Sequence, residues 1–401
     1  MTSSRPALLT RLRKLAIGLT ISAAMLGILE LGLRAAWWAA GAASHTVVIR
    51  NRFAPEHSTE LPTWLWDAMA PAQRSNVVSN AMAYPDHEFI FRVRPNPTGR
   101  PVLGFDGINA LGFRTAHLDA VPTGNEPVRA LRILHLGDSC AWGWGVRRFA
   151  ETMAPRIEQR LSAGGIAAEV VNLAEPGFTS TQGLKLFQRF FPKLKPSFVV
   201  LQYGWNDRRN SRGFTDRQVM RFLPIMNSQW ARLAMKSAIY RTLAWAATAR
   251  MPEPQNPAYG DRDLDPVVDN THMRVPLAES IENYRGMITQ AKAAGARVLV
   301  ILPPHKPSVR GLGPRIRDFN RELGEAFRDD VVFLPLPAMR EPSPDLDGYF
   351  DKDGIHPNPR GVAYIAEAIA DEIAREVRSD GKVAEVAASP TPADSRAAAL
   401  P

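Results

Sequence analysis

The chain has 401 residues, of which 45% are hydrophobic and 22% charged, a composition that indicates a folded protein and excludes a largely disordered one. Its single cysteine excludes an intramolecular disulfide and any metal site built from several cysteines. The net charge of +9 suits a membrane surface or an acidic polymer, but Lys and Arg are dispersed beyond the N-terminus and no nucleic-acid motif is present, so we expect no nucleic-acid partner.

The first predicted element is a membrane-spanning helix. Several Arg and Lys residues precede the apolar segment 15–33, whose only charged residue is Glu30. A helix over this segment covers about 28 Å, close to the hydrocarbon thickness of a bilayer. Because positive charge stays on the cytoplasmic side, we expect a basic cytoplasmic segment 1–14, a transmembrane anchor at 15–40 and an extracytoplasmic remainder, periplasmic or extracellular.

Two further features bear on this helix. Glu30 and Arg34 lie one helical turn apart and can pair near the outer boundary, where Trp37 and Trp38 suit the membrane interface. The alternative is a cleaved signal peptide, with the small residues 40–42 as its cleavage site. Both interpretations imply export of the rest of the chain.

Residues 45–130 are rich in Pro and Asn and are expected to form a lead-in segment that packs on the main domain. They contain one predicted strand at 87–95, followed by the turn-forming residues of 107–114. We expect this segment to add little regular structure of its own.

The main domain is predicted to extend from 131 to 380. Its short β-branched runs at 131–137, 168–174, 197–204, 296–304 and 331–336 alternate with helix-length segments, and the last helix is expected over 361–378. Runs of this kind are typical of βαβ units with a parallel sheet covered on both faces, so the predicted class is α/β. The Ala- and Pro-rich tail 381–401 is expected to be disordered.

The third and fourth runs are separated by far more residues than a simple crossover needs. We assign an insertion to 208–275, with helical apolar spacing over 220–251 and a loop-like stretch after it. An insertion at the C-terminal edge of a sheet can serve as a lid or a substrate-binding element. Extra helices that only pack on the domain are the alternative.

Chemically useful residues follow four of these segments. Gly137-Asp138-Ser139 ends the first run, Gly177 follows the second, Gly204-Trp205-Asn206-Asp207 ends the third, and Asp353-Gly354-Ile355-His356 follows the fifth. Loops at the C-terminal ends of parallel strands meet at one edge of the sheet, where ligands bind. Ser139 is unreactive without a base, which the imidazole of His356 can supply, and Asp353 can fix the tautomer of that imidazole.

In the order and type of these four blocks the chain resembles the SGNH hydrolases, also called GDSL esterases and lipases. The segments NALGFR (109–114) and GWGVRRFAET (143–152) resemble the flanks found in membrane-anchored bacterial members. The resemblance covers roughly 105–375 and implies a three-layer α/β/α fold with a central, mostly parallel five-stranded, flavodoxin-like sheet. It also implies Ser139, His356 and Asp353 as catalytic residues, and Ser139, Gly177 and Asn206 as donors of the oxyanion hole.

The resemblance therefore predicts a serine ester hydrolase that acts through an acyl-enzyme, without cofactor or metal. Its substrate would be an acyl ester, such as an O-acetyl ester, of an envelope or extracellular carbohydrate or lipid, or a small-molecule ester. An O-acyltransferase that modifies an extracytoplasmic polysaccharide uses the same intermediate and stays open, as does a noncatalytic envelope protein that binds through the same pocket. Cys140 is expected to be a buried filler, Asp207 to make structural hydrogen bonds, and Trp142, Trp144 and Trp205 to pack loops or stack on sugar rings.

Overall fold

A computed structural model of the chain describes residues 5–39, 46–49, 59–62, 83–86, 88–96, 98–102, 104–118, 130–209, 214–226, 229–234, 236–249, 273–304, 306, 312–340 and 343–379. The predicted tail 381–401 and the loop-like part of the insertion, 250–272, lie outside these residues.

The centre of the main domain is a five-stranded sheet of order β6-β5-β7-β8-β9. Its strands are β5 (Leu131–Gly137), β6 (Ala168–Asn172), β7 (Phe198–Gln202), β8 (Arg297–Val300) and β9 (Val332–Phe333). Every pairing in this sheet is parallel, with register pairs such as His135 with Asn172 and Gly137 with Gln202. The first strand of this sheet along the chain, β5, lies between β6 and β7, so its C-terminal end is flanked by the loops that carry Gly177 and Asn206.

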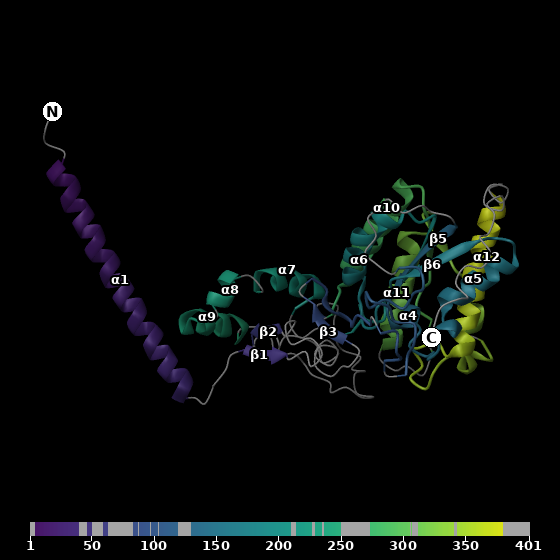
Figure 1. Ribbon diagram of the computed structural model, residues 1–401, viewed down its shortest axis with the longest axis horizontal. Coiled ribbons are helices and arrows are strands. Elements are labelled where there is room, and N and C mark those ends of the chain that lie inside the picture. The colour runs from purple at the N-terminus through teal and green to yellow at the C-terminus, as the bar shows by residue number, and fades with distance from the viewer. Residues whose placement is uncertain are drawn as a thin grey trace, which may run out of the picture.

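Helices cover both faces of this sheet (Figure 1). One face carries α6 (Ser180–Leu194), α10 (Leu277–Ala293) and α11 (Leu312–Ala326). The other carries α5 (Met153–Ala163) and α12 (Pro359–Ser379). Each helix turns an apolar stripe to the sheet, as the amphipathic spacing of its sequence requires. The predicted three-layer α/β/α fold is confirmed.

Shorter helices connect these elements: α4 (Ser139–Trp142) and the 3₁₀ turns Phe149–Glu151, Pro337–Met339 and Leu346–Tyr349. Before the domain, β1 (Thr46–Ile49) pairs with β2 (Thr59–Pro62), and β3 (Ala83–Asp86) pairs with β4 (Ile90–Val93). Both pairings are antiparallel. Only β4 was expected, within the predicted strand 87–95.

The described residues 88–118 of the lead-in segment pack on the domain. Phe89, Phe91 and Phe113 are buried in the core beside α6. Arg92 donates from Nε and Nη2 to Glu175 at 2.8 and 2.7 Å, and Glu175 also accepts the N–H of Val93 at 2.7 Å. This buried ion pair ties the lead-in segment to the loop that follows β6.

The insertion contains α7 (Asp216–Met226), α8 (Gln229–Ala234) and α9 (Ala238–Ala249). The helical spacing predicted over 220–251 is thus divided among three helices. One break has a local cause, because Ser237 Oγ accepts the N–H of Tyr240 at 3.3 Å and so starts α9 as its N-cap. In Figure 1 the insertion helices lie between the α/β domain and the N-terminal helix.

The N-terminal helix α1 runs over Arg5–Ala39, longer than the apolar segment that predicts it. Within it, Leu9–Ala36 is long and apolar enough to span a membrane, and none of its side chains is buried; it is the one such helix in the described part of the chain. The predicted pair is present, since Arg34 Nε donates to Glu30 Oε1 at 2.8 Å. Figure 1 shows α1 extending away from the rest of the molecule.

Candidate active site

Three of the predicted site residues form one hydrogen-bonded chain. Ser139 Oγ lies 2.7 Å from His356 Nε2, and His356 Nδ1 lies 2.5 Å from Asp353 Oδ2. Ser139 opens α4 directly after β5, whereas the other two residues lie in the loop before α12. Residues 217 positions apart are thus in the relative positions that a nucleophile, its base and the group orienting that base require.

The geometry of the Asp353 loop fixes the carboxylate as well as the imidazole. Asp353 Oδ1 accepts the N–H groups of Ile355 at 2.9 Å and of His356 at 3.0 Å. Burial raises the pKa of Asp353, but its hydrogen bonds to His356, the charge of that residue and the two N–H groups outweigh burial and hold the pKa at about 2. The carboxylate is therefore ionised throughout the physiological range, and its stabilising contribution is lost only as the pH falls from about 3.8 towards 2.

The turn that presents Ser139 is built from small and capping residues. Asp138 caps α4 by accepting the N–H of Cys140 at 2.9 Å, and its burial raises its pKa to about 6. A Cβ on Gly137 would lie 2.5 Å from the Cβ of Ala141 and 2.7 Å from the carbonyl oxygen of Gln202, so only glycine fits between β7 and α4. The strand can therefore turn sharply into the helix that carries the serine.

The other end of α4 predicts a modest loss of stability in Gly143→Ala. Gly143 caps the helix in the left-handed conformation (φ 87°), and an added Cβ would lie 3.1 Å from Thr152 Cγ2. We expect a loss of about 1–2 kcal/mol in the free energy of unfolding, measured by chemical denaturation, together with a lower kcat because α4 carries Ser139. Gly165→Ala is the matched control, since Gly165 also has positive φ (79°) but open space around it.

Gly165→Ala should lose comparable stability without loss of kcat. Gly165 lies in the turn after α5, away from α4 and Ser139 in the chain. Equal catalytic losses in the two variants would contradict a specific role of Gly143 in placing α4.

Each of the three residues predicted to form the oxyanion hole has an N–H hydrogen that is not used in a hydrogen bond among the described residues. Within the described residues, the backbone N–H groups of Ser139 and Gly177 donate no hydrogen bond. Gly177 has a φ of 84°, which suits glycine, and Asn206 is buried. The side-chain amide of Asn206 donates one hydrogen to the carbonyl of Phe178 at 3.0 Å and keeps a second hydrogen for another acceptor. Three unused donors on the loops around Ser139 fit the needs of an oxyanion.

The loop that carries Gly177 is held from two sides by residues that the sequence did not single out. Glu175 is bound by Arg92 of the lead-in segment, as described above. Arg274, at the end of the insertion, donates to the carbonyl of Gly177 at 3.0 Å and to Asp216 Oδ2 at 2.7 Å. Arg274 and Asp216 are fully buried, so this ion pair is shielded from solvent.

Arg114 plays a similar part on the other side of α4. Its guanidinium is fully buried and donates to the carbonyls of Gly143 at 3.0 Å, Val146 at 2.9 Å and Arg147 at 2.7 Å. It also lies 4.6 Å from the ring centroid of Trp142. The loop that follows α4 is therefore fixed by Arg114, which belongs to the NALGFR segment 109–114.

Two buried residues next to the motif residues, Asp207 and Cys140, do not have a chemical role. Asp207 accepts the Ser180 N–H at 2.8 Å, the Ser180 hydroxyl at 2.6 Å and the Ser280 hydroxyl at 2.8 Å, which is a structural role. Cys140 is buried, and burial raises the pKa of its thiol well above the usual value, so it is protonated and unreactive at neutral pH.

The three tryptophans beside the motif loops differ in exposure. Trp142 and Trp205 are buried and pack the loops on the core, whereas Trp144 is 38% exposed. Its ring centroid lies 6.2 Å from that of His356 and 5.3 Å from that of Phe105. Only Trp144 of this group is available to a substrate.

The described residues contain no cluster of three or more His, Cys, Asp or Glu side chains arranged to hold a metal ion.

The fold and this arrangement define a class. The model of the GDSL-like lipase/acylhydrolase family matches residues 135–364, and the chain belongs to this family of serine ester hydrolases. The predicted resemblance and the predicted enzyme class are confirmed.

Among solved structures, the chain is similar to TesA, with 19% identity over 60% of this chain and 97% of that one, at a TM-score of 0.39. It is also similar to the lipase/acylhydrolase of Enterococcus faecalis (18%, 61% and 96%, TM-score 0.41). A third similar structure is the acetyl xylan esterase AlAXEase (13%, 60% and 99%, TM-score 0.37). No curated protein matches the chain significantly.

Proposed function

We propose that this chain is a membrane-anchored hydrolase that removes acyl groups, acetyl among them, from esters of an extracytoplasmic carbohydrate or lipid. Ser139 is its nucleophile, His356 its general base, Asp353 the group that orients the base, and Ser139, Gly177 and Asn206 supply the oxyanion donors. The observation that carries this proposal is the hydrogen-bonded chain from Ser139 through His356 to Asp353.

The steps follow from these positions. Ser139 Oγ attacks the ester carbonyl while His356 Nε2 takes its proton, and the carbonyl oxygen gains negative charge opposite the unused N–H groups. His356 then gives the proton to the departing alcohol, which leaves an acyl group on Ser139. A water molecule, deprotonated by the same imidazole, releases the acid and restores the serine.

Trp144 supports a carbohydrate as the alcohol part of the substrate. It is the exposed tryptophan beside His356, and the face of an indole ring packs well against a sugar ring. Because the contact would be made equally in ground state and transition state, its loss acts on binding.

Trp144→Ala is accordingly expected to raise KM for an acetylated oligosaccharide roughly 2- to 10-fold, with kcat for p-nitrophenyl acetate nearly unchanged. Trp144→Phe, which keeps a ring, is the control, and its KM for the oligosaccharide should lie between that of the wild type and that of Trp144→Ala. An equal loss on both substrates would show that the residue supports the fold of the site and does not recognise the sugar.

The N-terminal helix supports an extracytoplasmic location of the catalytic domain. Basic residues in segment 1–14 favour a cytoplasmic N-terminus, the anchor 15–40 crosses the membrane, and the catalytic domain 131–380 then lies on the extracytoplasmic side. The lead-in segment 45–130 and the insertion 208–275 lie on the same side.

Full-length protein in detergent tests the function. Purified enzyme should hydrolyse p-nitrophenyl acetate and react with a fluorophosphonate probe at Ser139. Faster acetyl release with acetyl transfer to an added oligosaccharide would instead support the acyltransferase alternative. No labelling of the wild type, or equal labelling of Ser139→Ala, would contradict catalysis and favour a noncatalytic binding protein.

A further inference from the structure

Helix α1 is joined to the insertion through a carboxylate. Glu30 Oε1 accepts the N–H of Ala238 at 2.7 Å, while Oε2 accepts the N–H of Ile239 at 3.0 Å and the hydroxyl of Ser237 at 2.8 Å. The first N–H groups of a helix have no partner within it and favour a negative charge nearby. Glu30 therefore caps α9 from a position more than 200 residues away in the chain.

Arg34 completes this junction. Besides its hydrogen bond to Glu30, it donates from Nη2 to the carbonyl of Lys236 at 2.7 Å, just before α9 begins. The junction thus satisfies a carboxylate that would be costly to leave unpaired in an apolar helix beside lipid.

The position of Glu30 along α1 places the junction at the membrane surface. From Leu15, the first residue after the basic cluster, to Arg34 the helix rises about 28 Å, close to the thickness of the hydrocarbon layer. A span that begins at Leu15 therefore has Arg34 and the Lys236 carbonyl bound to it at the outer boundary, with Glu30 one helical turn beneath them.

The insertion helices expose large apolar side chains at this level. Trp230 is 81% exposed, Leu243 65% and Leu233 49%, and all three lie on α8 or α9. Outside α1, the one other exposed large hydrophobic side chain in the described part of the chain is Trp144 of the active site, at 38%. The exposed apolar residues are therefore concentrated next to the membrane span.

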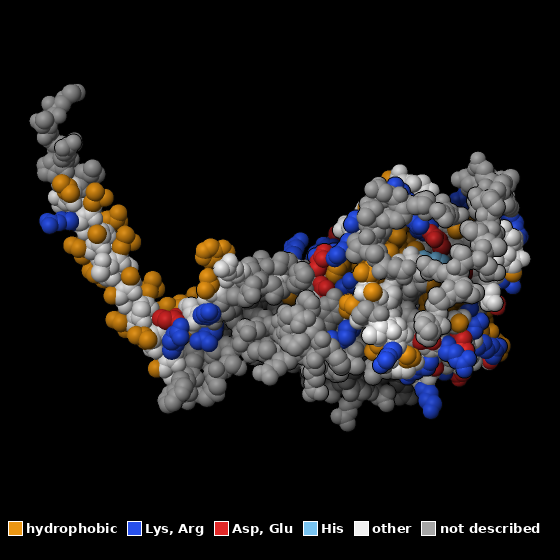
Figure 2. Space-filling view, in the orientation of Figure 1, with side chains coloured by type: hydrophobic (Ala, Val, Ile, Leu, Met, Phe, Trp, Pro, Cys, Tyr) orange, Lys and Arg blue, Asp and Glu red, His pale blue; other side chains and the backbone are white. Residues whose placement is uncertain are grey.

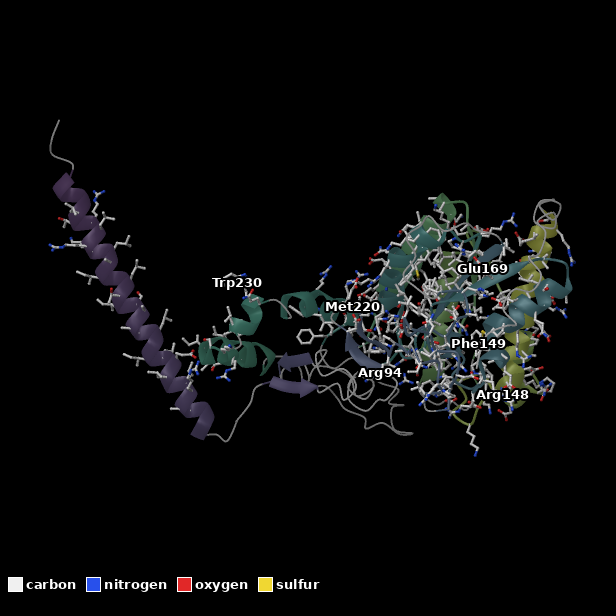
Figure 3. All side chains as sticks on the ribbon, in the orientation of Figure 1. Arg94, Arg148, Phe149, Glu169, Met220 and Trp230 are labelled. Atoms are coloured by element: carbon white, nitrogen blue, oxygen red, sulfur yellow. The ribbon has the colours of Figure 1, made fainter. Side chains whose placement is uncertain are left out.

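The surroundings of these residues resemble those of an interfacial helix. Lys236 is exposed and the side chain of Arg34 is 52% exposed, so cations lie beside the apolar side chains. Figure 2 shows this neighbourhood, with the basic side chains at the junction and apolar atoms on the helices next to it. In Figure 3 Trp230 lies on the edge of α8 that points away from β1 and β2.

We propose that Trp230, Leu233 and Leu243 form a lipid-binding surface that lies in the headgroup region of the membrane crossed by α1, with Glu30 fixing its depth. Tryptophan and leucine beside Lys and Arg are the side chains that bind this region. A lipid surface is favoured over a protein partner because the apolar residues continue directly from a membrane span and carry cations that match anionic headgroups.

This second attachment goes beyond the proposed catalytic activity. A single helix tethers a domain but leaves it free to turn about the helix axis. With α8 and α9 held in the interface as well, the sheet domain keeps one orientation towards the membrane. The same contacts make α1 part of the folded protein, which is the property of an anchor and not of a leader that is removed.

Brominated lipid tests the surface in the full chain. The protein is reconstituted into phosphatidylcholine and phosphatidylglycerol vesicles, with or without bromine high on the acyl chains, and tryptophan emission is compared. Because the chain has nine tryptophans, Trp230 should contribute roughly a tenth of the emission. We expect brominated lipid to quench this contribution in the wild type, and that part of the quenching to be absent from Trp230→Phe. Trp144→Phe is the matched control and should leave the quenching unchanged.

The role of the junction is tested in the same vesicles. Glu30→Ala should reduce the Trp230-dependent quenching at least about twofold, because α9 loses the contact that fixes its depth. Unchanged hydrolysis of p-nitrophenyl acetate by Trp230→Phe would show that the variant is folded.

Two results would overturn the proposal. Equal quenching of wild type and Trp230→Phe would show that Trp230 does not meet lipid. Protection of Trp230 from aqueous acrylamide without lipid quenching would assign the surface to a protein partner or a second copy of the chain. Either result comes from fluorescence alone and would leave the proposed hydrolase activity standing.

Discussion

Ser139→Ala should lower kcat for p-nitrophenyl acetate by roughly 10⁴- to 10⁶-fold and abolish fluorophosphonate labelling. Among the described residues beside His356, the Ser139 hydroxyl is the group placed to attack, since it lies 2.7 Å from His356 Nε2 while the neighbouring Cys140 is buried and protonated. His356→Ala should lose a similar factor, because the serine is a weak nucleophile without its base.

The decisive measurement is the residual kcat of the double variant. If Ser139 and His356 act as one unit, Ser139→Ala with His356→Ala should retain the same residual rate as either single variant. Asp353→Asn should lose less than these, since Asn can still hold the ring but in the wrong tautomer. Additive losses in the double variant, or a retained burst of product in Ser139→Ala, would contradict the assignment.

The second large effect is expected at the oxyanion hole. Asn206→Ala should lower kcat by about 10²- to 10³-fold with little change in KM, because the lost hydrogen bond forms only as charge develops on the carbonyl oxygen. The same amide also holds the carbonyl of Phe178, so the loop that carries Gly177 loses one of its supports. Steady-state kinetics on p-nitrophenyl acetate measures both parameters.

Asn206→Asp tests the same donor without a change of side-chain shape. A carboxylate offers no donor and its charge opposes that of the oxyanion, so its catalytic loss should equal or exceed that of Asn206→Ala. A loss below about 10-fold in either variant, in protein with an unchanged melting temperature, would show that Asn206 does not stabilise the oxyanion.

Much of the fold could be predicted because buried parallel strands appear in the sequence as apolar runs. The first run, 131–137, coincides with β5, and the later runs exceed the observed strands by a few residues where the chain leaves the sheet as extended loop. The order of the four blocks then predicted which loops approach Ser139. That hypothesis depends on topology, since strand ends of a parallel sheet share one edge.

The supporting ion pairs could not be predicted from the sequence. Arg274 and Asp216 are 58 residues apart, Arg92 and Glu175 are 83 apart, and each is one charged residue among many. Which charges are buried depends on tertiary distances that periodicity does not contain. A charge inside an apolar segment is the exception, and Glu30 stands out in the sequence for that reason, although the sequence does not predict its contact with α9.

The hydrogen bonds between Arg274, Asp216 and Arg209, where the insertion joins the domain, have a consequence for how this protein can vary. Besides the Arg274 and Asp216 pair, the Asp216 N–H donates to the Arg274 carbonyl at 2.9 Å and the Arg274 N–H to the Arg209 carbonyl at 2.8 Å. The two ends of the insertion are therefore held together where the insertion leaves and re-enters the domain, and Arg274 at this point also contacts the Gly177 loop. Helices beyond this point can be exchanged, lengthened or shortened at little entropic cost, so that membrane attachment and catalysis can evolve as separate modules.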